Sequence, residues 1–200
     1  MDLRFRKALR LEIGTIIYNF VEAGASLVIG KMSGSIALIG FGLDSIVENL
    51  SGFILVWRLR KHGIVSQEEE ERIEGRASQF VGISFFLLGA YILFESVRKM
   101  VQQDAPDPAP AGIVIAVLSL IIMPFLARAK LRLGREMGLR SLVADSKETL
   151  VCAWLSLALL IGLSANALFG FWVADPIVGI CIAGFLFREG RELIVENSRK

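Results

Sequence analysis

Residues 34–57 decide the fold: they read GSIALIGFGLDSIVENLSGFILVW, an apolar run long enough to cross a bilayer. A helix needs about 20 predominantly apolar residues to span a hydrocarbon core about 30 Å thick. This run also carries two acidic residues, Asp44 and Glu48, near its middle. The run therefore predicts a transmembrane helix that keeps two carboxyl groups inside the membrane.

Five more apolar runs of comparable length accompany it. The chain is 54% hydrophobic, above the roughly 45–50% of ordinary soluble domains, and its mean hydropathy is +0.59. No secretory signal peptide is expected, because the first apolar run is itself of spanning length. These features predict an all-α membrane protein formed by residues 1–200 as one six-helix domain, with no cytoplasmic C-terminal domain and with spans near 13–30, 34–57, 78–97, 111–127, 141–163 and 172–187.

Lysine and arginine predict the orientation, because loops rich in them stay in the cytoplasm. Of the 22 such residues, 18 fall on the side of the two termini, three on the opposite side, and Lys147 lies inside the fifth span. Both termini are therefore expected in the cytoplasm. This bias also accounts for the net charge of +2, so nucleic-acid binding is not expected. Cys152 and Cys181 occupy different spans, which excludes a disulfide framework, and Cys181 is expected to pack among small residues.

Two polar pairs within the spans indicate a metal site. Asp44 and Glu48 lie four residues apart, as do Glu148 and Cys152, so each pair shares one helical face. Charges at mid-bilayer cost at least about 2.5–3.5 kcal/mol each on an insertion scale, so they must face each other, water or an ion. Because the second and fifth spans are antiparallel, we expect Asp44 to meet Cys152 and Glu48 to meet Glu148.

Three oxygen-bearing side chains and a thiolate around one point suit a tetrahedral ion. A thiolate among the ligands favours Zn²⁺ or Cd²⁺ over Mg²⁺ or Ca²⁺. The alternative is a structural contact in each pair, with the carboxylates neutralised by Lys147 or hydrogen-bonded to Ser45 or Ser146. Two pairs at matching depth favour a metal or proton site over that alternative.

Other polar residues of the spans have weaker assignments. Asn19 and Glu22, three apart in the first span, either line the ion path or hold helices together. Asp145 is expected on the approach to the site, with Lys147 as its counter-charge. Asp175 precedes a proline at the start of the sixth span, a sequence that suits the capping of a helix N-terminus, with a role in the path as the alternative.

Residues near the ends of spans are expected to play structural parts. Glu95 and Arg98 are predicted to pair at the end of the third span. The acidic run Glu68–Glu71 is expected to be a solvated helix face, with a metal-collecting role, assisted by His62, as the less favoured reading.

Four segments carry a family resemblance: GSIALIGFGLDSIVE, ADSKETLVC, WVADPIVGICIAGFLFREGREL and IIYNFVEAG. Together they resemble the cation diffusion facilitator family of divalent-metal/proton antiporters. GSIALIGFGLDSIVE resembles the family's second-helix segment, in which two acidic or histidine ligands stand four apart, and ADSKETLVC resembles its fifth helix. WVADPIVGICIAGFLFREGREL is similar to the sixth helix, and the asparagine of IIYNFVEAG matches one in the first. Two departures are visible: the fifth helix has glutamate and cysteine where histidine or aspartate is common, and the family's cytoplasmic domain has no counterpart in the sequence.

The resemblance implies a metal site formed by Asp44, Glu48, Glu148 and Cys152. It implies a homodimeric transporter in a membrane, here the inner membrane of a prokaryote, that exports Zn²⁺, with Cd²⁺ as the other candidate. Binding a divalent ion expels protons from such ligands, so exchange for protons by alternating access is expected. The alternatives are a metal-binding sensor or scaffold that does not transport and, far less favoured because Cys152 fills the fourth ligand position, an intramembrane metalloenzyme.

Overall fold

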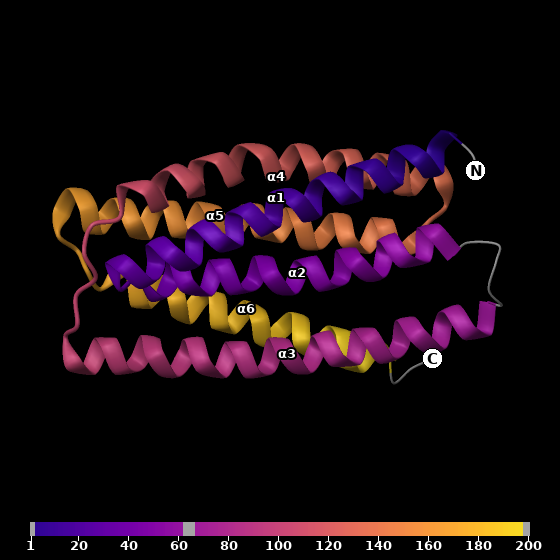
Figure 1. Ribbon diagram of the computed structural model, residues 1–200. Coiled ribbons are helices and arrows are strands. Elements are labelled where there is room, and N and C mark those ends of the chain that lie inside the picture. The colour runs from indigo at the N-terminus through magenta and orange to yellow at the C-terminus, as the bar shows by residue number, and fades with distance from the viewer. Residues whose placement is uncertain (1–2, 62–66, 198–200) are drawn as a thin grey trace.

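The structure, a computed structural model, describes residues 3–61 and 67–197, and its described residues form helices and connecting turns without strands. The predicted all-α fold with six helices is confirmed (Figure 1). Four helices extend beyond their predicted apolar spans at both ends, whereas α2 and α6 begin two residues inside theirs and extend beyond them at the C-terminal end. In chain order the helices are α1 Leu3–Ser33, α2 Ile36–Lys61, α3 Gln67–Gln102, α4 Pro110–Met137, α5 Arg140–Phe169 and α6 Ala174–Asn197.

Four of the helices, α1, α2, α4 and α5, are long and apolar enough to cross a membrane, judged over the described residues by length and composition. Large apolar side chains are exposed along them, for example Val21 and Phe125, each 68% exposed. Such exposure suits contact with lipid rather than water. The chain is accordingly an integral membrane protein.

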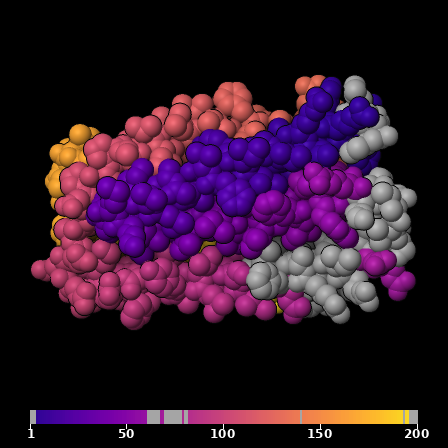
Figure 2. Space-filling view, viewed as in Figure 1, coloured from indigo at the N-terminus to yellow at the C-terminus, as the bar shows by residue number. Residues whose placement is uncertain are grey.

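The helices form three closely packed antiparallel pairs, α1 with α2, α4 with α5 and α3 with α6 (Figure 1). Figure 2 shows α1 and α2 covering one face of the bundle above α3. Helix α1 begins and α6 finishes at the same end of the bundle, as an even number of spans requires. We call this the inner end; that it faces the cytoplasm remains a prediction from the lysine and arginine count.

Glycine in the left-handed conformation makes the tight turns of two of these pairs. Gly34 has φ +70° between α1 and α2, and Gly138 has φ +66° between α4 and α5. An L-residue with a side chain seldom adopts this region, whereas glycine does so without penalty. The short turns force each following helix to run back along its predecessor.

The N-terminus of α2 is capped by a side chain from the last helix. Asp175 of α6 is fully buried and accepts hydrogen bonds from the Ser35 hydroxyl and from the Ile36 backbone N–H, the latter at 2.9 Å. The Ser35 hydroxyl oxygen in turn accepts from the Leu38 N–H at 3.1 Å. Asp175 is thus a capping residue, but the hydrogen bonds described for it go to α2 rather than to its own helix.

Several sequence-based expectations need correction. Lys130, counted among the residues of a cytoplasmic loop, lies inside α4 and is fully buried. Cys181, expected to pack among small residues, is exposed. The predicted pair is confirmed, because an Arg98 guanidinium nitrogen and a Glu95 carboxylate oxygen are 2.8 Å apart.

The acidic run is described only in part. Glu68 and Glu69 are exposed in α3, as expected of a solvated face. His62 and the side chains of Glu70 and Glu71 lie outside what the structure describes.

Asp175→Ala should destabilise the bundle, because it leaves the first turn of α2 without its acceptor. We expect a loss of about 1–2 kcal/mol, the range measured for helix caps, seen as a lower midpoint of thermal unfolding in detergent. Asp107→Ala is the matched control: Asp107 is an exposed aspartate at the same end of the bundle, and its replacement should change stability by less than about 0.5 kcal/mol. Equal effects of the two substitutions would contradict the capping role.

Candidate metal site

The predicted ligands lie on facing stretches of α2 and α5 inside the bundle. Asp44, Glu48 and Cys152 are 5%, 7% and 1% exposed, and Glu148 is half-buried. The Thr149 hydroxyl of α5 donates a hydrogen bond of 3.0 Å to a carboxylate oxygen of Glu48. The two helices therefore bring both polar pairs into one region, as the sequence predicts.

The expected pairing of Asp44 with Cys152 and of Glu48 with Glu148 remains a prediction. Glu48 interacts with the side chains of Thr149 and Cys152, and it also lies within electrostatic range of Glu148. Asp44 lies within electrostatic range of Glu48 and Cys152. Both acidic residues of α2 thus lie near the Cys152 thiol.

Among the described residues, no three His, Cys, Asp or Glu side chains stand close enough together to hold a metal ion in the arrangement seen. The chemistry of the region nevertheless suits a metal. The second carboxylate oxygen of Glu48 is buried without a hydrogen-bond partner, and the Cys152 thiol lies beside this carboxyl group. A buried acceptor of this kind is costly unless something binds it. The four-ligand set remains a prediction.

Two predicted path residues of α1 lie beside the same region. Glu22 is buried and accepts hydrogen bonds from the Tyr18 hydroxyl at 3.1 Å and the Ser45 hydroxyl at 3.0 Å. Asn19 is also buried, and its side-chain oxygen has no hydrogen-bond partner among the described residues. Through Ser45, the residue after Asp44, Glu22 joins α1 to α2. This position suits both roles expected for Glu22, lining the ion path and holding helices together.

A buried ion-pair network continues from Glu48 toward the inner end. The Lys130 ammonium of α4 is 2.5 Å from a carboxylate oxygen of Asp145 and 3.3 Å from both carboxylate oxygens of Glu12. It also donates to the Thr149 hydroxyl oxygen at 3.2 Å, and Thr149 donates to Glu48. Lys130 therefore balances Asp145, whereas Lys147, the expected counter-charge, is exposed.

Sequence reasoning missed Glu12, Lys130 and Thr149, but α4 carries a signal for one of them. Its buried positions recur at helical spacing, and position 130 falls within the series. A lysine on the face otherwise formed by small and apolar residues predicts a buried cation with acidic partners. The buried residues of α4 are Gly112, Ala116, Ser119, Met123, Ala127, Lys130 and Gly134.

Helix α6 adds one more acidic residue that the sequence did not single out. Glu189 is half-buried and lies within electrostatic range of Asp44 and Glu148. It comes from the α3–α6 pair, whereas the predicted ligands come from α2 and α5. Negative charge from both parts of the bundle therefore converges on the candidate site.

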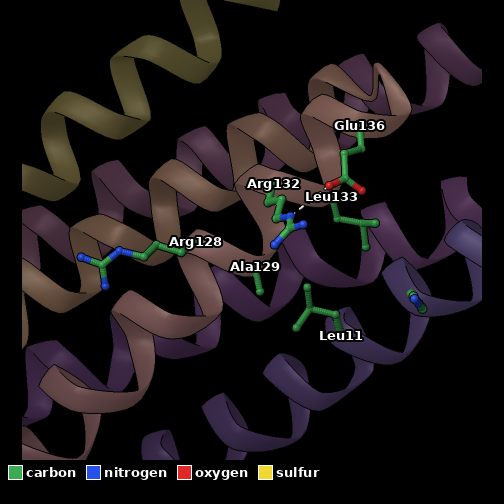
Figure 3. Close-up of a pocket in the computed structure, with 7 residues that line it drawn as sticks. Leu11, Arg128, Ala129, Arg132, Leu133 and Glu136 are labelled. Carbon is green, nitrogen blue, oxygen red and sulfur yellow. Dashed lines mark hydrogen bonds and ion pairs between the residues drawn. The ribbon is translucent and has the colours of Figure 1, made fainter.

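A separate pocket of about 660 Å³ opens on the surface between α1 and α4 at the inner end (Figure 3). Figure 3 shows Leu11 of α1 opposite Ala129 and Leu133 of α4, with Arg132 turned toward Glu136. The Arg132–Glu136 ion pair measures 3.0 Å. With three cationic residues in its lining, this pocket is electrostatically unsuited to a divalent cation, and it is lined by Lys7, Leu11, Arg128, Ala129, Arg132, Leu133 and Glu136.

Thr149→Val should destabilise the protein, because it removes the hydroxyl that joins Lys130 to Glu48 while keeping the side-chain volume. Leaving buried groups without a partner costs about 1–3 kcal/mol. The measurement is the midpoint of thermal unfolding. Ser156→Ala is the matched control on α5, since that hydroxyl donates only to the Cys152 carbonyl of its own helix, at 2.7 Å, and its loss should cost less than about 1 kcal/mol. A larger effect of Ser156→Ala than of Thr149→Val would contradict the bridging role.

The fold and the site together define a class of protein: a membrane-embedded helical bundle that gathers carboxylates and a thiol in its interior. Polar and ionisable residues in such a position mark ion pathways. Residues 13–200 match the model of the cation efflux transmembrane domain, and the chain therefore belongs to the cation efflux family, which is the cation diffusion facilitator family of the resemblance. The family assigned from the sequence motifs is confirmed.

Individual relatives are distant in sequence. The chain is 24% identical to magnetosome protein MamB of Magnetospira sp. over 84% of its length, covering 59% of that protein. It is 25% identical to transmembrane protein 163 of Xenopus laevis over 96% of its length, covering 67% of that protein. An uncharacterized transporter of Methanocaldococcus jannaschii is 23% identical over 92% of the chain and is covered to 66%. The chain thus spans about three fifths to two thirds of the length of these relatives.

Proposed function

We propose that this chain transports a divalent metal cation across a membrane, with Asp44, Glu48, Glu148 and Cys152 as the ligands. The observation that carries the proposal is the buried Glu48 carboxyl, which has one oxygen held by Thr149, the other without a partner, and the Cys152 thiol beside it. Membership of the cation efflux family supports it. Small movements of α2 against α5 would then bring Asp44 and Glu148 to the ion bound by Glu48 and Cys152.

The ion in this proposal is Zn²⁺, with Cd²⁺ as a second substrate. A site with one thiolate suits a borderline or soft ion, because hard ions such as Mg²⁺ prefer an all-oxygen shell of more ligands. Cys152 is 1% exposed, so a bound ion there would be shielded from bulk water.

Exchange for protons follows from the ligand chemistry. A thiol must lose its proton to bind the metal, and a buried carboxyl group without a counter-ion is more stable protonated than charged. Metal binding therefore releases protons, and protons arriving from outside displace the metal outward. The direction of export rests on the family and on the predicted cytoplasmic inner end.

Alternating access requires one part of the bundle to move relative to another. The α3–α6 pair is closely packed within itself and makes fewer contacts with α2 and α5. It carries Glu189 close to the predicted ligands, so its displacement would change the electrostatics of the site. We place the protein in the inner membrane of a prokaryote as a homodimer with both termini in the cytoplasm.

Transport is tested by Zn²⁺ flux into proteoliposomes under an imposed pH gradient. The native protein should transport, and Glu148→Ala should lower the rate at least tenfold because it removes a ligand. Glu136→Ala, which changes an exposed glutamate at the inner surface, is the matched control and should transport normally. Native protein that binds Zn²⁺ but passes none would replace the transporter with the alternative, a metal-binding sensor or scaffold.

Cys152→Ser should change which ion is preferred rather than abolish binding. A hydroxyl oxygen in place of the thiolate weakens the preference for Zn²⁺ and Cd²⁺ relative to Mn²⁺. We expect the ratio of Cd²⁺ to Mn²⁺ affinity, measured by competition binding to the purified protein, to fall at least tenfold. Cys181→Ser, which alters the exposed cysteine, should leave the ratio unchanged. An unchanged ratio in Cys152→Ser would remove this thiol from the ligand set.

A further inference from the structure

The oxygen atoms around Lys130 form a cation-binding arrangement of their own. Both carboxylate oxygens of Glu12 lie 3.3 Å from the ammonium nitrogen, Asp145 Oδ2 lies 2.5 Å away and Thr149 Oγ1 lies 3.2 Å away. These atoms come from α1 and α5, whereas the lysine comes from α4. We call Glu12, Asp145 and Thr149 the inner oxygen site.

This site is deeply enclosed. Glu12 and Thr149 are 1% and 0% exposed, and Asp145 is 6% exposed. Its wall on α2 is Gly52, where an added Cβ would lie 3.0 Å from a carboxylate oxygen of Glu12. Two buried carboxylates without a cation or a proton would be strongly unfavourable, and here an ammonium group supplies the positive charge.

The inner oxygen site lies beside the proposed metal site, on its inner side. Asp145 precedes Glu148 and Cys152 on α5, which runs outward from the inner end, and Thr149 belongs to both regions through its hydrogen bond to Glu48. A metal ion that reached Glu48 from the inner end would pass close to these oxygens. An ion of the wrong kind could lodge there.

We propose that the inner oxygen site is a second cation site, selective for hard cations, which the protein keeps filled with the ammonium group of its own Lys130. Its ligands are carboxylate and hydroxyl oxygens without sulfur or nitrogen, the set that Mg²⁺, Mn²⁺ and Ca²⁺ prefer. The ammonium prevents these ions from binding at the inner oxygen site. The proposed metal site, which contains Cys152, then binds the softer ion. The inference rests on the proposed function for this last step only.

The two sites are also coupled through Thr149. Its oxygen accepts from Lys130, and its one hydrogen has two acceptors within reach, Glu48 at 3.0 Å and the Asp145 carbonyl oxygen of its own helix at 3.1 Å. Thr149 therefore joins the lysine to one Glu48 oxygen. The other Glu48 oxygen is left unpartnered for a ligand.

The test is to remove the ammonium and supply a hard cation. Lys130→Met removes the ammonium group, shortens the unbranched side chain by one atom and keeps all the oxygen ligands. We expect the purified variant to gain one Mn²⁺ site per chain, detected by electron paramagnetic resonance in detergent, and Mn²⁺ to raise its unfolding midpoint. The native protein should show neither effect. Lys130→Met without any gain of Mn²⁺ binding would overturn the proposal.

The matched control is the double variant Lys130→Met with Glu12→Gln. It has the same net charge as the native protein but lacks one carboxylate of the inner oxygen site, so it should fold and bind no additional Mn²⁺. If the single variant fails to fold, we expect Mn²⁺ present during purification to restore it. A single variant that stays unfolded in Mn²⁺ while the double variant folds would count against a site able to accept a hard cation.

Zn²⁺ binding to the same preparations separates this inference from the proposed function. A native protein without Zn²⁺ affinity, together with a Mn²⁺ gain in Lys130→Met, would leave the inner oxygen site standing and remove the metal ligands proposed for transport. Zn²⁺ binding in both proteins without the Mn²⁺ gain would leave the proposed metal ligands standing and overturn the inner oxygen site as a second cation site.

Discussion

The interior of this bundle depends on compensation between Lys130 and the carboxylates around it. An isolated charge cannot be held in an apolar interior, so each buried carboxylate needs a cation, a hydrogen-bond donor or a proton. One ammonium group supplies this to Glu12 and Asp145 directly and to Glu48 through Thr149. Because the five side chains come from α1, α2, α4 and α5, the network joins the helices that are most clearly membrane-spanning.

The buried acidic groups differ in how completely their oxygens are bound by other side chains. Glu12 and Asp145 are committed to the lysine, and Glu22 is held by the Tyr18 and Ser45 hydroxyls. Glu48 and Asp145 each keep one carboxylate oxygen without a hydrogen-bond partner among the described residues, but Asp145 contacts the ammonium directly, whereas Glu48 reaches it through Thr149. A site that must bind and release an ion needs groups in this last state, because a fully satisfied carboxylate gains little from a metal and an unrestrained one loses conformational entropy on binding it.

Local patterns in the sequence predicted the parts of the structure that depend on nearest neighbours. Apolar run length predicted the six helices, and the four-residue spacing of Asp44 with Glu48 placed two carboxyls on one buried face. The network was not predictable in the same way, because Lys130 and Glu12 are 118 residues apart and their contact depends on how α1 packs against α4. Counting Lys130 as a loop charge was wrong because apolar run length underestimates a helix that continues past its hydrophobic segment.

The contacts at the candidate site likewise depend on helix packing, which local sequence patterns do not reveal. Antiparallel α2 and α5 were expected, and the contact between Glu48 and Thr149 depends in addition on how these two helices pack against each other. This packing brings Thr149, a residue with no metal-binding signature, next to Glu48. The role of Thr149 depends on its contacts with both Lys130 and Glu48, and the linear sequence does not reveal these contacts.

The cap on α2 has a consequence for how the molecule is made. Ser35 and the first N–H groups of α2 emerge from the ribosome early, whereas their partner Asp175 belongs to the last helix, about 140 residues later. Until α6 is inserted, the beginning of α2 lacks this acceptor and must rely on water or lipid headgroups. The second helix can therefore cross the membrane early, but its outer end acquires these hydrogen bonds only when the sixth helix is in place, so the two helices complete their structure together.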